Sequence, residues 1–254
     1  QRENLMIGGA MTDVKGDRGL SPSQQEDPDM FVHVTKRDSK GVYITGAKAH
    51  QTGCINSHWI IAMPTMRLKS EDKDYALIGA IAVDAPGITY IYGRQSCDTR
   101  SMEGGNIDAG NAMYSGQEAM IIFKDVFIPN HLIFMNGEYE FASMLVERFT
   151  CYHRRSYVCK TGLGDILIGA AAAIADYNGV ANASHIKDKL VEMTHLNETI
   201  FAAGIASSYR AHKTSAGNWQ NDDMLANVCK HNVTRFPYEI GRLAQDIAGG
   251  LVVT

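Results

Sequence analysis

A short segment in the second half of the chain gathers four side chains that can do chemistry. His153 and Tyr157 lie four residues apart, and Cys159 and Lys160 follow at once. Residues four apart share one face of a helix, so the imidazole and the phenol are expected side by side. The segment offers a base, a phenol donor, a soft metal ligand and a cation. The competing interpretation is a core histidine with a buried cysteine, which is common in helical proteins.

Two polar clusters in the first half could line a cofactor site. The segment 9–18 mixes small residues, carboxylates and cations without a clear period, as in loops that wrap a polar cofactor. The segment 48–53 places hydrogen-bonding side chains at the end of a predicted strand. A solvated loop and a polar turn are the competing interpretations. The candidate cofactor residues are Met11, Thr12, Lys15, Asp17, Arg18, His50, Gln51 and Thr52.

A weaker cluster lies near the end of the chain. Asn232 and Arg235 precede a predicted helix segment that runs into Gly249 and Gly250. Paired glycines at a helix end can admit a phosphate close to the backbone. They can equally cap the helix, so this pattern alone leaves both interpretations open.

In the first half of the chain, the two polar clusters are expected to be positioned by strands. Short apolar runs alternate with turn-rich segments, which is typical of an antiparallel barrel or sandwich. A hairpin is predicted from the first two runs, and Glu118 begins the last. The predicted strands are 31–35, 41–49, 59–63, 75–83, 88–92 and 118–123.

The second half reads as helices. Apolar residues recur at spacings of three and four, which predicts long helices over 141–177, 184–212 and 221–247. We expect a kink near Gly162 and Gly164 in the first, an end at Asn178-Gly179, and a kink at Pro237 in the third. The sequence therefore predicts a β domain over 1–137, then a helical bundle over 138–254.

Composition narrows the class of protein. The net charge of −4 and the pI of about 6.1 do not indicate binding to nucleic acid or to an anionic membrane. Five scattered cysteines do not suggest a disulfide framework, and a reducing compartment is expected. No signal peptide is visible, and the longest apolar stretch, 166–175, is too short to span a bilayer. Both ends of the sequence look like cuts in a longer protein.

These clusters, in this order, resemble the family of 4-hydroxybutyryl-CoA dehydratases and vinylacetyl-CoA isomerases. The resemblance covers essentially the whole chain. More distantly, the sequence is similar to flavin-dependent 4-hydroxyphenylacetate monooxygenases. The runs that carry the resemblance are GAMTDVKGDRGLSPSQQ (9–25), GAKAHQTG (46–53), YGRQSCDTR (92–100), VERF (146–149), YHRRSY (152–157), ASHIKDKLVEMTHLNET (183–199) and ANVCKHNVTRFPYEIGRLAQDIAGGL (226–251).

The resemblance implies an α+β, acyl-CoA dehydrogenase-like fold, with a β middle domain, a C-terminal helical bundle and an N-terminal helical domain upstream of this chain. It implies FAD and a [4Fe–4S] cluster, for which His153 and Cys159 match two ligands and two further cysteines lie upstream. Family roles around the substrate fall on Glu118, Tyr157 and Lys160. Segments that contact flavin or substrate match Thr52 and the loop 11–18. Asn232, Arg235, Gly249 and Gly250 match stretches assigned to FAD.

The implied reaction is dehydration of 4-hydroxybutyryl-CoA to crotonyl-CoA, through a flavin-dependent ketyl radical with an iron–sulfur Lewis acid, together with vinylacetyl-CoA isomerisation. The family pattern carries one more residue between the tyrosine and the cysteine. On a regular helix the six-residue step from His153 to Cys159 leaves the two about 120° apart. A bulge or an unwound turn would restore the site, and otherwise cluster binding is impaired.

Three alternatives stay open. The first is an FAD-dependent aromatic monooxygenase of the 4-hydroxyphenylacetate type, the second a cluster-free isomerase, and the third an inactive fragment. The resemblance further implies an acyl-CoA substrate, a cytoplasmic homotetramer, and no nucleic-acid or membrane partner. We expect this chain alone to be inactive, because the upstream part and two cluster ligands lie outside it.

Overall fold

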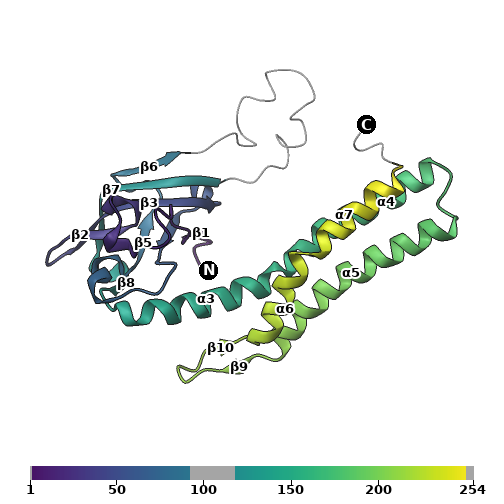
Figure 1. Cartoon of the computed structure of the whole chain (residues 1–254). Helices are drawn as coiled ribbons and strands as arrows, with labels where there is room; N and C mark the ends of the chain where they lie inside the picture. Colours follow the sequence, from purple (N-terminus) through teal and green to yellow (C-terminus); the bar gives the residue numbers. More distant parts are fainter. Residues whose placement is uncertain (1, 92–117, 250–254) are drawn as a thin grey trace, which may run out of the picture. The chain divides into compact units, whose positions relative to one another are not determined.

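The structure is a computed structural model that describes residues 2–91 and 118–249. The chain divides into two compact units, Gln1–Val146 and Glu147–Thr254, whereas the sequence prediction placed the boundary after residue 137. Strands gather in the first unit and helices in the second (Figure 1). The predicted α+β class, with a β part before a helical part, is therefore confirmed.

The first unit contains two four-stranded sheets among its described residues, with strand orders β1-β4-β5-β8 and β2-β3-β7-β6. The second of these is antiparallel throughout, and its long pair β3 and β7 forms the centre of the sheet. The strands are β1 (Ile7–Ala10), β2 (His33–Arg37), β3 (Gly41–Thr52), β4 (Trp59–Ala62), β5 (Leu77–Ala82), β6 (Ile88–Ile91), β7 (Glu118–Pro129) and β8 (Ile133–Asn136).

One hydrophobic core joins the two sheets. Val42 and Ile44 on β3 are buried and alternate with less buried neighbours, as expected for a strand with one face inward. Phe123 on β7 lies in the same cluster, together with Ile60 on β4 and Ile81 on β5. Burial of this shared face places the ends of β1, β3 and β4 around a common polar network.

The antiparallel barrel or sandwich that the sequence predicted needs two corrections. Strand β1 was predicted as loop, yet it pairs with β4, and it does so in parallel. Its Gly8 and Gly9 give no strand signal of their own, so tertiary pairing decides its conformation. Within the described residues the two sheets do not close into a barrel, which leaves the sandwich form.

Short 3-10 helices connect the strands. The longest, η4, surrounds Asp72, which is fully buried. The Asp72 carboxylate accepts from the Ser23 N–H at 3.0 Å, the Ser23 hydroxyl at 2.6 Å and the Lys69 N–H at 3.1 Å. These helices are η1 (Pro22–Gln24), η2 (Pro28–Met30), η3 (Cys54–Asn56), η4 (Ser70–Tyr75), η5 (Asn130–Leu132) and η6 (Tyr139–Phe141).

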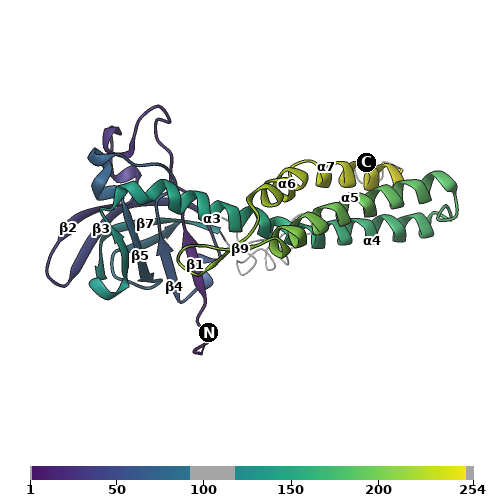
Figure 2. The same cartoon turned by 90° about the horizontal axis from the view of Figure 1, so that it is seen from below.

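The second unit is helical, apart from one small hairpin. Helices α4 and α5 pack side by side, and α6 and α7 pack against them (Figures 1 and 2). The core includes Ala171, Met193 and Ile240. Its elements, with the segment that leads into it, are α3 (Ala142–Ser156), η7 (Tyr157–Lys160), α4 (Thr161–Tyr177), α5 (Ser184–Tyr209), β9 (His212–Lys213), β10 (Trp219–Gln220), α6 (Asp223–Val233) and α7 (Phe236–Ile247).

Two of the predicted long helices are broken. The first is interrupted by the 3-10 turn η7, ahead of the glycines where we expected the kink. The third separates into α6 and α7, and Pro237 lies in the first turn of α7 because that position needs no backbone N–H. The predicted end at Asn178-Gly179 is confirmed. Gly179 has φ +69°, and the Val180 N–H donates to Ala175 O at 2.9 Å, as in a Schellman cap.

One helical run among the described residues, Tyr139–Tyr177, is long and apolar enough to cross a membrane by length and composition, and 17% of its apolar window is buried. The sequence prediction counted only the stretch 166–175. The two differ because the run continues through η7 and combines α3 with α4. A single run of this kind is a weak indication of a membrane span.

Candidate functional site

The predicted pair His153 and Tyr157 forms in the last turn of α3 and the first residue of η7. The two ring centroids lie 4.9 Å apart with an interplanar angle of 64°, which is an edge-to-face contact. Phe149 stacks on the other side of His153 at 5.7 Å and 22°. The four-residue spacing therefore places the imidazole between two aromatic rings, as the helical period requires.

The turn η7 lies between His153 and Cys159 and changes their angular relation. A 3-10 turn rotates by about 120° per residue, against about 100° in an α-helix. Three α steps and three 3-10 steps sum to about 660°, so the two residues lie about 60° from sharing a face. The regular helix left about 120°. The 3-10 turn is wound more tightly than an α-helix, and it removes about half of the angular mismatch between His153 and Cys159.

Helix α5 holds this turn by close packing. Gly204 faces Val158, and a Cβ at Gly204 would lie 2.7 Å from the Val158 Cβ, so only glycine lets the two segments approach this closely. About two helical turns before this contact on α5 lies Asn197, whose side-chain amide donates to Thr161 O at 3.1 Å and to Asp165 Oδ1 at 2.8 Å. The start of α4 is therefore fixed directly after η7.

Helix α6 holds the same segment from another side. The Cys229 thiol donates to Arg155 O at 3.8 Å, and Arg154 donates to the Asn227 side chain at 2.7 Å. These contacts place Lys230 against the site. Its Nζ lies 3.7 Å from the centroid of the Tyr157 ring, close enough for a cation–π interaction.

The charge around His153 favours its neutral form. Desolvation lowers the pKa of the imidazole from its ordinary value, and the cations of Lys230 and Lys160 lower it further. A neutral imidazole can accept a proton or bind a metal. Sequence reasoning missed Lys230, because it lies more than seventy residues from His153 and no local pattern marks it.

Cys159 is exposed, and Cys54, Cys151 and Cys229 are buried, and all four are free thiols. In the described residues no group of three or more His, Cys, Asp or Glu side chains is placed to hold a metal ion. Imidazole nitrogen and thiolate sulfur are suitable ligands for an iron–sulfur cluster. His153 and Cys159 are both exposed, and their two donor atoms are fewer than the four ligands that such a cluster takes.

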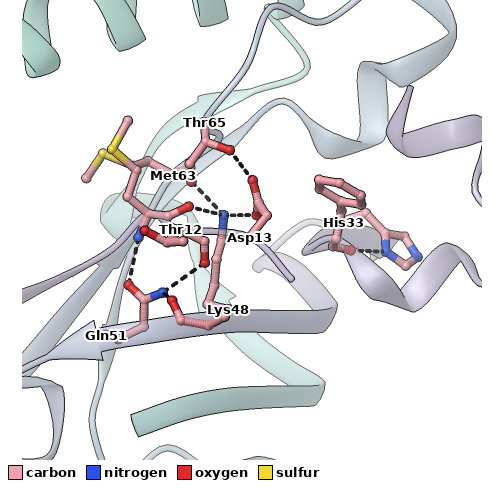
Figure 3. A network of polar contacts seen from close by, with 10 residues as sticks. Thr12, Asp13, His33, Lys48, Gln51, Met63 and Thr65 are labelled. Carbon is pink, nitrogen blue, oxygen red and sulfur yellow. Dashed lines mark hydrogen bonds and ion pairs between the residues drawn. The ribbon is translucent and has the colours of Figure 1, made fainter. Parts of the chain in front are cut away.

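In the first unit, the backbone of Met11 and Thr12 is fastened to β3. The Met11 N–H donates to Gln51 Oε1 at 3.0 Å, and Gln51 Nε2 donates to Thr12 O at 2.9 Å (Figure 3). Gln51 is buried, and its amide also donates to Ala49 O. Gln51 therefore positions the predicted cofactor loop through its side chain.

From Lys15 to Arg18 the loop is exposed and turns sharply. Lys15 has φ +87° and Gly16 has φ +36°, and a Cβ at Gly16 would lie 2.2 Å from Gln25 Oε1. That same oxygen accepts from the Asp17 N–H at 2.9 Å. Arg18 follows and is exposed. Buried Gln25 thus shapes the exposed stretch of the loop that carries Lys15, Asp17 and Arg18.

Thr52 and Glu118, predicted separately, are brought together. They are partners in the β3–β7 register, and the Thr52 hydroxyl donates to Glu118 Oε1 at 2.8 Å. His50 precedes them at an irregularity in that register, with φ +55° and an exposed side chain. A bulge at a sheet end redirects side chains, which is common beside binding sites.

The predicted cofactor residues near the end of the chain take part in the structure of helices α6 and α7. Asn232 is buried in the last turn of α6. Arg235 is exposed, and its Nη1 lies 3.4 Å from Nε2 of His231. Gly249 has φ +65° and its N–H donates to Asp246 O at 3.1 Å, so it caps the C-terminus of α7. Gly250, Cys97 and the run 92–100 lie outside the described residues.

The family is decided by two family models. The model for the N-terminal part of 4-hydroxyphenylacetate 3-hydroxylase matches residues 1–135, and the model for its C-terminal part matches residues 142–254. The chain belongs to the 4-hydroxyphenylacetate 3-hydroxylase family. Both sheets and the helical unit described above fall within the matched residues.

Two of the proteins that this chain resembles are named as dehydratases. It is 60% identical over 256 residues to the 4-hydroxybutyryl-CoA dehydratase/vinylacetyl-CoA-Δ-isomerase of Clostridium aminobutyricum, covering 100% of this chain and 52% of that protein. A solved oxygen-tolerant archaeal 4-hydroxybutyryl-CoA dehydratase from N. maritimus is 75% identical with a TM-score of 0.94, covering 100% of this chain and 51% of the other. The chain thus spans about half the length of these relatives. The resemblance predicted from sequence is confirmed.

More distant structures show the fold of the hydroxylase family. The oxygenase component of 4-hydroxyphenylacetate 3-monooxygenase, complexed with FAD, is 21% identical with a TM-score of 0.84, covering 99% of this chain and 53% of the other. Butyryl-CoA dehydrogenase from Megasphaera elsdenii is 14% identical with a TM-score of 0.68, covering 98% and 59%. The predicted acyl-CoA dehydrogenase-like fold is confirmed.

Proposed function

We propose that this chain is an internal part of an enzyme that dehydrates 4-hydroxybutyryl-CoA to crotonyl-CoA and isomerises vinylacetyl-CoA, comprising its β middle domain and part of its C-terminal helical bundle. The observation that carries the proposal is the 60% identity to the Clostridium enzyme across the whole chain. The archaeal dehydratase, at 75% identity, supports it. The enzyme is then a hydro-lyase with isomerase activity, and this chain by itself is inactive.

The proposed cofactors are FAD and a [4Fe–4S] cluster. When bound, FAD supplies one-electron chemistry to the acyl-CoA, and the cluster supplies a Lewis acid for the leaving hydroxyl. His153 and Cys159 would hold the cluster, with two further ligands from upstream. Contacts to FAD are assigned to Met11, Thr12, Lys15, Asp17, Arg18, His50, Thr52, Asn232, Arg235, Gly249 and Gly250, and Gln51 holds two of these in place.

Four side chains are proposed to handle the protons and to orient the substrate: His153, Tyr157, Lys160 and Glu118. His153, whose pKa is lowered by its surroundings, would take a proton from the substrate carbon as well as serve as an iron ligand, with its ligation exchanged or weakened in turnover. Tyr157, in contact with that imidazole, and Lys160 orient the substrate oxygen. Glu118, bonded to Thr52, relays or positions a proton. Each role depends on a side chain held within hydrogen-bonding reach of a reacting atom.

The assembly is proposed to be a cytoplasmic homotetramer. In the described chain, large apolar side chains on α4 and α5 are exposed, among them Ile166 at 69% and Val191 at 68%. Apolar surface of this kind is commonly covered by another subunit. Sedimentation of the full-length enzyme tests this part of the proposal, and a monomer would refute it.

The experiment uses the full-length enzyme purified without oxygen. We expect about four irons and bound FAD per subunit, and formation of crotonyl-CoA from 4-hydroxybutyryl-CoA followed by chromatography. His153→Ala and Tyr157→Phe should abolish dehydration. The matched controls are His195→Ala, which removes a histidine that is 69% exposed on α5, and Tyr177→Phe at the exposed end of α4. Near-normal activity of both site variants would contradict the assignment.

A second candidate, an FAD-dependent aromatic monooxygenase, is favoured by the family models themselves. It would need reduced flavin and oxygen, and no iron. An enzyme that holds FAD without iron and hydroxylates 4-hydroxyphenylacetate would select it. FAD without iron, with isomerisation of vinylacetyl-CoA and no dehydration, would select a cluster-free isomerase.

A further inference from the structure

A charged pair is buried at the point where β1 and β4 end. Lys48 on β3 is 2% exposed, and Asp13, which follows β1, is 3% exposed. Lysine and aspartate are almost never buried this completely unless they are paired. Burial lowers the pKa of the Lys48 ammonium, and the Asp13 charge opposes that effect.

All three hydrogens of the Lys48 ammonium have acceptors. Nζ donates to Met11 O at 3.0 Å, to Met63 O at 2.8 Å and to Asp13 Oδ1. The other carboxylate oxygen, Asp13 Oδ2, accepts from the Thr65 hydroxyl. Figure 3 shows the ammonium between these groups. Lys48 therefore ties the segment after β1 to the segment after β4, and a lysine has no further donor to offer.

These bonds fix the direction of the backbone at Met11 and Thr12. A trans peptide directs its C=O and its N–H to opposite sides. The Met11 carbonyl points to Lys48, so the Thr12 N–H points away from it. Likewise the Thr12 carbonyl accepts from the Ala49 N–H and from Gln51 Nε2. The Asp13 N–H belongs to the same peptide and therefore points to the opposite side. Two consecutive backbone donors are thus held in fixed directions.

The burial of Lys48 and Asp13 is better explained by the backbone geometry that the pair fixes than by a gain in folding free energy. Replacing a buried ion pair with apolar side chains is often neutral or stabilising, because desolvation offsets the attraction. The cavity beside Lys48 and Asp13 encloses about 10 Å³, which is room for about one water molecule. A cofactor or an acyl-CoA cannot enter there, so the ammonium must act through the backbone that it holds.

We propose that Lys48 is a positioning residue for the flavin: it clamps the ends of β1 and β4 so that the backbone of Thr12 and Asp13 presents its N–H groups to the cofactor. The inference rests on the proposed function, since that assigns this loop to FAD. Asp13 and Thr65 complete the clamp by holding the ammonium in place.

The test uses the full-length enzyme and Lys48→Met, which keeps the length and removes the charge. In the FAD-free protein, amide exchange over residues 11–15 and 63–65 should become at least about tenfold faster, because the ends of the two strands open locally. FAD should bind about tenfold or more weakly. Thr65→Val, which keeps Lys48 and removes one hydroxyl, should show the same changes to a smaller degree and covers the case in which Lys48→Met does not fold.

Asp72→Asn is the matched control, because it alters another buried carboxylate of the same unit that bonds to none of the clamp residues. It should lower Tm and leave FAD affinity and exchange over residues 11–15 unchanged. FAD affinity in Lys48→Met equal to wild type, or an equal loss in Asp72→Asn, would overturn the inference. A wild-type enzyme that takes up no FAD would overturn the proposed function together with the role given to the clamp, whereas the exchange rates report the clamp independently of the cofactor.

Discussion

Replacing Gly204 with alanine tests how the turn η7 is held. The new Cβ would lie 2.7 Å from the Val158 Cβ and 2.9 Å from its Cγ2, so one of the two segments must shift. Overpacking of this kind costs about 1–3 kcal/mol. Alanine has a better helix propensity than glycine by about 1 kcal/mol, which offsets part of the cost.

Gly169→Ala on α4 isolates the packing effect. Nothing lies within 4 Å of a Cβ at Gly169, so this variant should gain the helix propensity, about 1 kcal/mol, without a clash. The two variants should therefore differ in unfolding free energy by about 1–3 kcal/mol, with Gly204→Ala the less stable. Urea unfolding at low protein concentration measures the difference. Equal stabilisation by both substitutions would refute the close approach of α5 to Val158.

Three further outcomes follow from the same structure. Lys230→Met should raise the pKa of His153 by removing a cation, as measured by NMR titration of iron-free protein. Because the folded-state pKa of His153 lies below its ordinary value, the stability that it contributes is present at neutral pH and is lost as pH falls below the ordinary value. An unchanged titration in the variant would count against the contact. At pH 8, iodoacetamide should label exposed Cys159 well before Cys54, whose thiol is buried with its pKa raised to about 11 by desolvation; mass spectrometry showing equal labelling would contradict this. Gly179→Ala should destabilise by about 1 kcal/mol because φ is +69° there, and a thermal scan showing no loss would argue against the cap.

The elements with strong local periodicity were predictable. The alternation in β3, with Val42 and Ile44 inward, and the apolar stripe of α5 both follow from burial of one face. Strand β1 was missed, because Gly8 and Gly9 carry no strand preference and only pairing with β4 decides their conformation. The helix break was placed at Gly162 and Gly164 for a local reason, whereas packing against α5 sets the tightened turn earlier.

The candidate site likewise contains residues that the sequence could predict and residues that it could not. The contact between His153 and Tyr157 follows from helical spacing alone. Lys230 was not predicted, and Lys48 was named only as the first residue of the polar segment 48–53. Each lysine reaches its place through a contact distant in sequence, for which a single lysine gives no pattern. Gln51 was predicted as a cofactor contact, and the structure shows that its amide is occupied by the loop backbone.

The tightened turn η7 also bears on how this helix tolerates a change in chain length. A residue removed from an α-helix shortens it by about 1.5 Å and turns everything beyond it by about 100°. Four residues in 3-10 geometry each add about 0.5 Å and 20° over the α-helical values, or about 2 Å and 80° together. The turn Tyr157–Lys160 therefore supplies most of the rotation, and slightly more than the rise, of one further α-helical residue. A segment that can tighten in this way absorbs a change of one residue in chain length that a regular helix would pass on to every residue beyond it.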